Sequence, residues 1–129
     1  MNLDRLGVHK NLSMILSTKQ WISAIKKLGG IPIIAHPGEF EKQFQGDSHV
    51  KRDTLYLALC ELIRMGLVGL EVFHPKHTAQ QELEYLILAK RLGLLITAGS
   101  DFHGRHTMSR KVGMHGVRAI DIMDVIMQK

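Results

Sequence analysis

The sequence has little of several features that mark specialised protein classes. A single cysteine, Cys60, excludes an intramolecular disulfide, and its apolar helical surroundings favour a small core residue. No apolar run approaches the ~18 residues of a membrane-spanning helix, and the N-terminus lacks the pattern of a cleaved signal peptide. Aromatic residues are only 5% of the chain and are not interleaved with basic ones, unlike a stacking platform for single-stranded nucleic acid. We therefore expect a cytoplasmic protein without membrane contacts.

The bulk composition is that of an ordinary globular protein. The 129 residues are 45% hydrophobic and 22% charged, which predicts one domain or part of one. The net charge of +5 is spread along the chain, so solvated helix faces explain it, and an electropositive surface that attracts phosphate-bearing substrates is the alternative. The eight histidines are more informative, because imidazole is the commonest metal ligand in proteins.

Helical and strand-like segments alternate along the chain, which predicts an α/β fold with parallel strands. Residues 1–16 are irregular and are expected to be a remnant or insertion tail, while residues 17–129 form the folded part. Capping boxes at Ser17 and Thr78 predict two helix starts. The expected helices cover about 17–28, 51–65, 78–92 and 119–127, the expected strands are 31–35, 67–73 and 94–98, and residues 39–50 are expected to be a loop.

Candidate ligands follow each predicted strand. His36 follows the first, His74 and His77 follow the second, and Asp101 and His103 follow the third. Because the carboxyl ends of parallel strands lie at one edge of a sheet, these groups should converge there. Imidazole and carboxylate suit Zn, Mn or Fe.

Each of these residues also has a plain structural interpretation. Asp101 and His103 fit a strand followed by a turn, and Glu71, inside the second strand, fits a charge near a strand end. His49 is expected to be a surface histidine. The recurrence of such groups after every strand is what favours a shared site.

Three stretches carry a family resemblance: GGIPIIAHPG, GLVGLEVFHPKHT and GLLITAGSDFHG. Together they resemble the polymerase-and-histidinol-phosphatase (PHP) family, and most of all its small bacterial stand-alone phosphoesterases. Some of those enzymes hydrolyse nucleoside 3′,5′-bisphosphates or trim short 5′-phosphorylated RNA. The resemblance runs from about residue 17 to 116 and implies the C-terminal half of a distorted (βα)7 barrel.

The resemblance also implies roles for particular residues. His36, Asp101 and His103 match metal ligands, His77 matches a histidine of this subgroup with an implied catalytic role, and His74 occupies a variable position. In the loop after the third motif, Arg105 would assist catalysis or, with Arg110, bind the substrate phosphate; solvated loop charges are the alternative. The implied cofactors are divalent ions (Mn, Zn or Fe), and the implied substrate is a small phosphorylated molecule, with nucleic acid only as a short substrate.

The sequence departs from the family pattern at its beginning. The family's opening His-x-His strand, its Asp-His pair and its bridging Glu have no counterpart, since residues 1–16 contain only His9. We therefore expect a C-terminal portion of a metal-dependent phosphoesterase with little activity alone. A catalytically inactive module that serves as a structural or partner-binding fragment is the alternative. The partner implied is an N-terminal PHP fragment. The residues expected in the core of the sheet are Ile33, Ile34, Leu70, Val72, Leu95 and Ile96.

Overall fold

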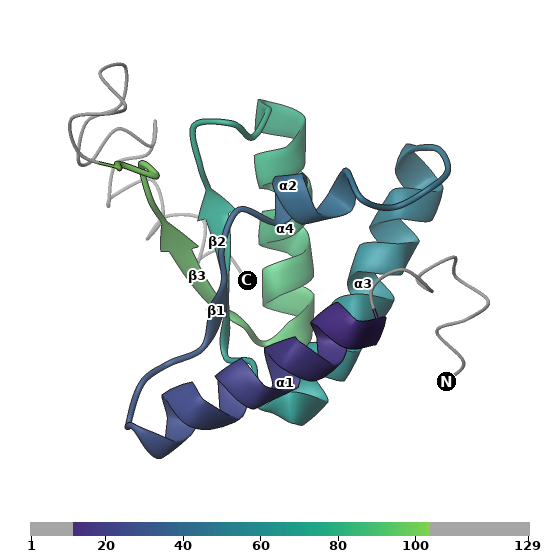
Figure 1. The fold of residues 1–129 in the computed structure, drawn as a ribbon. Coiled ribbons are helices and arrows are strands. Elements are labelled where there is room, and N and C mark those ends of the chain that lie inside the picture. The colour runs from purple at the N-terminus through teal and green to yellow at the C-terminus, as the bar shows by residue number, and fades with distance from the viewer. Residues whose placement is uncertain (1–11, 104–129) are drawn as a thin grey trace.

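The protein is described by a computed structural model, which defines the backbone of residues 12–103 and the side chains from Thr18 onward. The predicted helix at 119–127 and the predicted substrate-binding Arg105 and Arg110 lie outside the described residues. The elements run in the order α1 (Leu12–Lys27), β1 (Ile33–Ile34), α2 (Pro37–Glu41), α3 (Ser48–Met65), β2 (Gly69–Phe73), α4 (Ala79–Leu92) and β3 (Leu95–Ala98) (Figure 1).

The strands form a parallel sheet in the order β1-β2-β3, which confirms the predicted α/β class. Ile33, Gly69 and Leu95 form one row across the sheet, and Ile34, Leu70 and Ile96 form the next. Successive residues of a strand point to opposite faces, so the two rows belong to opposite faces. The register shifts between Glu71 and Phe73, which places an irregularity near the end of β2.

Helix α4 starts and ends where the sequence predicts. The Thr78 hydroxyl accepts a hydrogen bond from the Gln81 backbone N–H, and the Gln81 side chain accepts one from the Thr78 backbone N–H, which completes the capping box. Gly93 ends the helix with a φ of 67°, in the left-handed region that glycine adopts without strain.

Two other helix starts differ from the prediction. Helix α1 begins at Leu12, so Ser17 lies inside it and is not its N-cap. Helix α3 begins at Ser48, because the Asp47 carboxylate accepts hydrogen bonds from the backbone N–H groups of His49 and Val50. The predicted loop 39–50 also contains the end of the short helix α2. The apolar pattern that predicted a start at residue 51 did not take the Asp47 cap into account.

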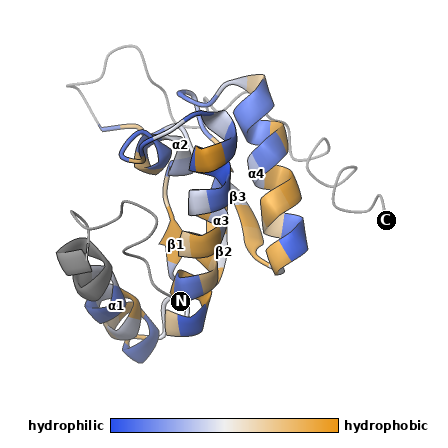
Figure 2. Cartoon of the chain, turned by 90° about the vertical axis from the view of Figure 1, so that its right-hand side faces the viewer, coloured by the Kyte–Doolittle hydropathy of each residue, from blue (hydrophilic) through white to orange (hydrophobic). Residues whose placement is uncertain are grey.

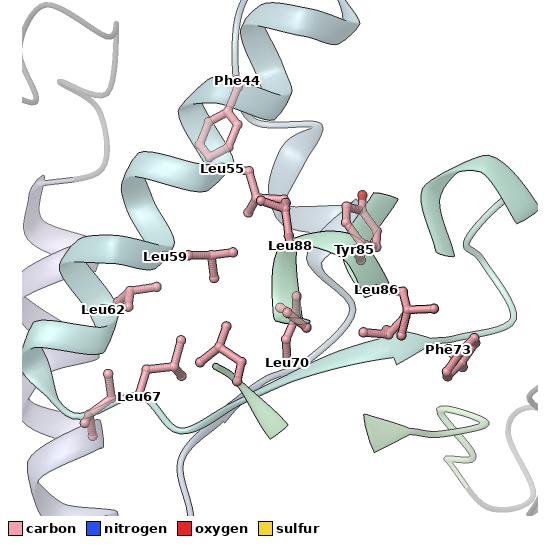
Figure 3. Close-up of a cluster of buried hydrophobic side chains, with 14 residues drawn as sticks. Phe44, Leu55, Leu59, Leu62, Leu67, Leu70, Phe73, Tyr85, Leu86 and Leu88 are labelled. Carbon is pink, nitrogen blue, oxygen red and sulfur yellow. The ribbon is translucent and has the colours of Figure 1, made fainter. Parts of the chain in front are cut away.

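The hydrophobic core lies between β2 and the two long helices α3 and α4. Figure 3 shows leucines of α3 pointing toward side chains of α4 and β2. Leu55, Leu59, Leu70, Val72 and Tyr85 are completely buried. Cys60 is only half-buried, so it lies beside this core and not within it.

The opposite face of the sheet is open, which corrects the prediction that all six strand residues are buried. Leu70 and Val72 are buried as predicted, and Ile34 and Ile96 pack against the core. Ile33 and Leu95, however, are 39% and 49% exposed. Among residues 12–103 the helices gather on one side of the strands (Figures 1 and 2), and none of these helices forms a layer over the opposite face. The prediction assumed helices on both faces.

Within residues 12–103, no helix has the length and apolar character needed to span a membrane. The cytoplasmic location is not tested by this finding and stays a prediction.

The one-sided sheet predicts a sharp difference between two leucines. Leu70→Ala should lower the free energy of unfolding by about 2–5 kcal/mol, because it empties a packed site between β2 and the helices. Leu95→Ala is the matched control on the neighbouring strand and should cost well under half as much, since Leu95 is 49% exposed. Urea unfolding of the full chain followed by circular dichroism measures both, and equal losses would contradict the one-sided arrangement.

Candidate functional site

The structure brings the candidate residues that follow the three strands into one connected cluster. The rings of His36, after β1, and His74, after β2, have centroids 5.4 Å apart. His74 Nε2 lies 3.6 Å from Asp101 Oδ2, and His103 Nδ1 lies 3.4 Å from Asp101 Oδ1. The predicted convergence at the carboxyl edge of the sheet is therefore present, with His74 as the link between His36 and Asp101. The roles of these residues as ligands stay predictions.

Two residues of this cluster have unusual backbone conformations. His36 and Asp101 have φ values of 30° and 54°, and they are the non-glycine residues with positive φ in the described part of the chain. For residues with a Cβ, this conformation costs free energy and persists only where the surroundings impose it. Strain of this kind clusters at functional sites, so its coincidence with two predicted ligands supports the site.

Glu71 connects the ends of the first and third strands. Its Oε2 accepts a 2.7 Å hydrogen bond from the His36 backbone N–H, which fixes the chain where His36 leaves β1. Its Oε1 lies against Gly99, where any Cβ would overlap the carboxylate. Sequence reasoning left Glu71 as a strand-end charge. The signal for a structural role was its place between Leu70 and Val72, because alternation must direct it to the opposite face from the core.

His74 is held by a tight turn. The His77 backbone N–H donates to the His74 carbonyl over 2.9 Å, with Pro75 at the second position of the turn. The Lys76 backbone N–H also donates to His74 Nδ1 over 3.1 Å. The whole residue is 1% exposed, so it is the buried histidine of the cluster. The residues alone placed His74 among the groups expected at this edge, but the family resemblance implied no role for it, so it was not among the predicted ligands or catalytic residues.

His77 engages the backbone with both ring nitrogens. Its Nδ1–H donates to the Val72 carbonyl over 2.8 Å, and its Nε2 accepts from the Gly38 N–H over 3.3 Å. Burial holds the pKa of His77 below its ordinary range, which favours the neutral ring that this pairing requires. The ring therefore joins the loop after β2 to the start of α2. Its predicted catalytic role stays a prediction, and Nε2 would have to release Gly38 to fulfil it.

His103 has the hydrogen bonding of a typical metal-binding histidine. Its Nδ1–H donates to the Asp101 carbonyl oxygen over 2.6 Å. In a neutral imidazole this places the lone pair on Nε2, the nitrogen through which such a histidine binds a metal. The side chain is 62% exposed.

Buried polar groups anchor α2, the helix that His36 precedes. The Tyr85 hydroxyl donates to Glu41 Oε2 over 2.8 Å, and burial raises the pKa of Tyr85. The Arg52 guanidinium lies between the Glu41 and Glu84 carboxylates and pairs most closely with Glu84. Side chains of α3 and α4 thereby fix the end of α2, so the position of His36 depends on both long helices.

The donor types fit a divalent metal, but the described residues do not complete a metal site. His36, Asp101 and His103 offer the nitrogen and oxygen ligands that Zn, Mn and Fe accept. Nevertheless, within residues 12–103 no group of three or more His, Cys, Asp or Glu side chains is arranged to hold an ion. The described residues can therefore supply part of a ligand set, and tight binding requires further ligands.

A cavity of about 280 Å³ lies beside the cluster, between α1, β1, α2 and α3. Of the candidate site residues, His36 alone lines it, together with mostly apolar side chains such as Ile34 and Phe40. The cavity is on the helical side of β1 and does not reach Asp101. It borders the cluster without forming its centre.

Comparison with known proteins finds phosphoesterases, although no family model matches the chain. Over 85 residues it is 35% identical to the phosphoribosyl 1,2-cyclic phosphate 1,2-diphosphodiesterase of Eggerthella lenta and 31% identical to the 3′,5′-nucleoside bisphosphate phosphatase of Chromobacterium violaceum. Each match covers 66% of this chain but only 28% and 27% of the respective relative. The chain thus spans a little over a quarter of their length.

A solved structure shares the fold. The crystal structure of a protein described as a metal-dependent phosphoesterase, from Bifidobacterium adolescentis, matches with a TM-score of 0.61 and 29% identity. The match covers 84% of this chain and 35% of that protein. These similarities agree with the predicted relationship to phosphoesterases, and the α/β arrangement agrees with part of a larger domain of that kind.

Glu71 and Gly99 should be energetically coupled. Gly99→Ala should lower the free energy of unfolding by about 1 kcal/mol, because the new Cβ overlaps the Glu71 carboxylate, which must turn away and weaken its hydrogen bond with the His36 backbone N–H. In a Glu71→Ala background the same substitution should cost much less, since the obstructing side chain is gone. A double-mutant cycle by urea unfolding measures the coupling. Additive effects would show that the two residues do not meet.

Proposed function

We propose that this chain forms the C-terminal part of a PHP-type metal-dependent phosphoesterase that hydrolyses nucleotide phosphate esters or trims short 5′-phosphorylated RNA. The observation that carries the proposal is the connected cluster of His36, His74, Asp101 and His103 at the carboxyl edge of a parallel sheet. The similarity to a nucleoside bisphosphate phosphatase and to a cyclic phosphate diphosphodiesterase supports the substrate class.

In this proposal the chain supplies metal ligands and phosphate-binding groups. His36, Asp101 and His103 would hold divalent ions, and the ions would supply an acidified water and neutralise charge on the phosphate. Other residues of the chain would bind the substrate or position a ligand. Arg105 and Arg110 would hold the substrate phosphate through charge-assisted hydrogen bonds. Glu71 would keep His36 in place through the backbone N–H.

The open face of the sheet supports a further segment of the same domain as the partner. Ile33 and Leu95 lie exposed on that face, and β1 and β3 are the edges of the described sheet. In a barrel whose helices lie outside, the inner face is filled by side chains from the remaining strands. The relatives are more than three times as long as the matched segment. An N-terminal PHP segment, in the same or another polypeptide, would close this face and contribute the remaining ligands.

The second candidate is a catalytically inactive module that binds a partner or has a structural role. The specific observation in its favour is that the described residues contain no complete metal-binding group. The two candidates differ in whether the chain, once joined by the complementary segment, gains hydrolytic activity.

Metal binding should depend on the predicted ligands. The full chain should bind Zn²⁺ or Mn²⁺ weakly, and the double variant His36→Ala, Asp101→Ala should lose affinity by at least ~10–100-fold, the usual cost of removing a ligand or its support. The matched control is His49→Ala, Asp53→Ala, which removes an exposed histidine and aspartate from α3. Isothermal titration calorimetry measures all three proteins. Equal affinity in both double variants would contradict a metal site at the strand ends.

Activity should require the complementary segment. The isolated chain should hydrolyse a nucleoside 3′,5′-bisphosphate barely or not at all in the presence of Mn²⁺, because its sequence has no counterpart of the opening His-x-His, Asp-His and Glu motifs of the PHP family. Mixing it with a fragment that carries the N-terminal motifs of a PHP protein should produce release of phosphate. The same mixture with the His36→Ala, Asp101→Ala variant is the control. Rapid turnover by the isolated wild-type chain would show that these residues suffice, and an inactive mixture that still forms a complex would favour the inactive module.

A further inference from the structure

The hydrogen bonds of the histidines in the cluster distinguish two kinds of imidazole. A neutral imidazole carries a proton on one nitrogen and a lone pair on the other. The partner of one nitrogen therefore fixes what the other can do. A histidine that binds a metal usually donates a hydrogen bond from its second nitrogen to a carbonyl or carboxylate oxygen.

His103 has this ligand-type pattern, and His74 has the opposite one. His103 Nδ1–H donates to a carbonyl oxygen, so in the neutral ring the lone pair is on Nε2. The Nδ1 of His74 instead accepts a hydrogen bond from the Lys76 backbone N–H over 3.1 Å. An acceptor nitrogen carries no proton, so the proton of the neutral His74 ring is on Nε2. His74 is therefore a donor at Nε2, where a ligand would need a lone pair.

Among the described residues, a carboxylate oxygen faces His74 Nε2. Asp101 Oδ2 lies 3.6 Å from it, somewhat beyond an ideal hydrogen bond. Polar contacts at functional sites are often long without ligand and shorten when the ligand binds. The His74 side chain is 0% exposed and that of Asp101 is 19% exposed, so little water competes for this contact. In such surroundings an N–H directed at a carboxylate is stronger than in water.

We propose that His74 is a positioning residue that orients the Asp101 carboxylate through Nε2–H and does not itself bind metal. Within the turn from His74 to His77, the Lys76 N–H fixes the orientation of the His74 ring through Nδ1. The opposite nitrogen of the ring, Nε2, then faces Asp101 Oδ2. Oδ1 stays on the side of His103, where the Nδ1 to Oδ1 separation is 3.4 Å. This arrangement restrains a residue whose backbone is already in a costly conformation. The role toward an ion rests on the proposed function, whereas the tautomer of His74 and its contact with Asp101 do not.

The tautomer can be read directly from the zinc-free chain. Nitrogen-15 NMR of the full chain at mildly alkaline pH should show a protonated Nε2 and an unprotonated Nδ1 for His74. His103 should show the reverse. On addition of Zn²⁺ the Nε2 signal of His103 should shift, while His74 keeps its proton on Nε2. A protonated Nδ1 in His74, or loss of its Nε2 proton when zinc binds, would overturn the proposal.

Two substitutions of His74 test whether it orients the Asp101 carboxylate or only fills the space beside it. His74→Gln can keep an N–H directed at Asp101, and His74→Leu cannot. In zinc-free protein the carboxyl carbon signal of Asp101 should move with His74→Leu and stay near its wild-type position with His74→Gln. The affinity for Zn²⁺ should fall ~10–100-fold in the leucine variant and much less in the glutamine variant. Circular dichroism checks that each variant is folded.

The outcomes distinguish the two hypotheses. If the wild-type chain binds no zinc, the proposed function fails, but the zinc-free measurements on Asp101 still decide the role of His74. If the leucine and glutamine variants have the same Asp101 signal as the wild type, His74 does not orient the carboxylate. If the leucine variant does not fold, the tautomer and the glutamine variant still decide the proposal.

Discussion

The alternation of side chains along β2 is the constraint on which the rest of the structure depends. Leu70 and Val72 are completely buried beneath α3 and α4, so Gly69 and Glu71, which alternate with them, must face the other side of the sheet. Gly69 then lies between Ile33 and Leu95, where a Cβ would be 3.0 and 3.2 Å from their side chains. The burial of Leu70 and Val72 thereby places Gly69 close to the side chains of Ile33 and Leu95, and it places Glu71 on the same face as Gly69.

The end of β2 changes this alternation and creates the site. The register shifts between Glu71 and Phe73, and Val72, Phe73 and His74 are all buried in succession. Irregularities of this kind redirect side chains at the ends of strands. His74 consequently points to the segment after β3 and meets Asp101, while Glu71 holds the segment after β1. The central strand therefore positions both neighbours, and the positive φ values of His36 and Asp101 are tolerated because each adjoins one of these contacts.

The sequence predicted the elements well where the signal was local. Apolar periodicity, the Thr78 capping box and the glycines after the helices placed α4, β2 and β3 within a few residues of their observed bounds. The start of α1 was wrong, because a helix can continue through a serine that would also make a good cap. The exposure of Ile33 and Leu95 could not be predicted, since it depends on which faces the helices cover. Local patterns carry no information on that choice.

The site was predictable as a location and not as a set of roles. Residue types and the rule for parallel strands placed His36, Asp101 and His103 at one edge, and the structure brings them together with His74 as the link. Which imidazole nitrogen carries a proton depends on backbone groups such as the Lys76 N–H and the Asp101 carbonyl, and a motif does not specify these. Two histidines of the same cluster can therefore have opposite hydrogen-bonding character. The contacts also explain how the strand ends are held: Glu71 fixes the residue after β1, and His74 lies against the segment after β3. The arrangement of these groups therefore comes from contacts among the three described strands and the segments that follow them.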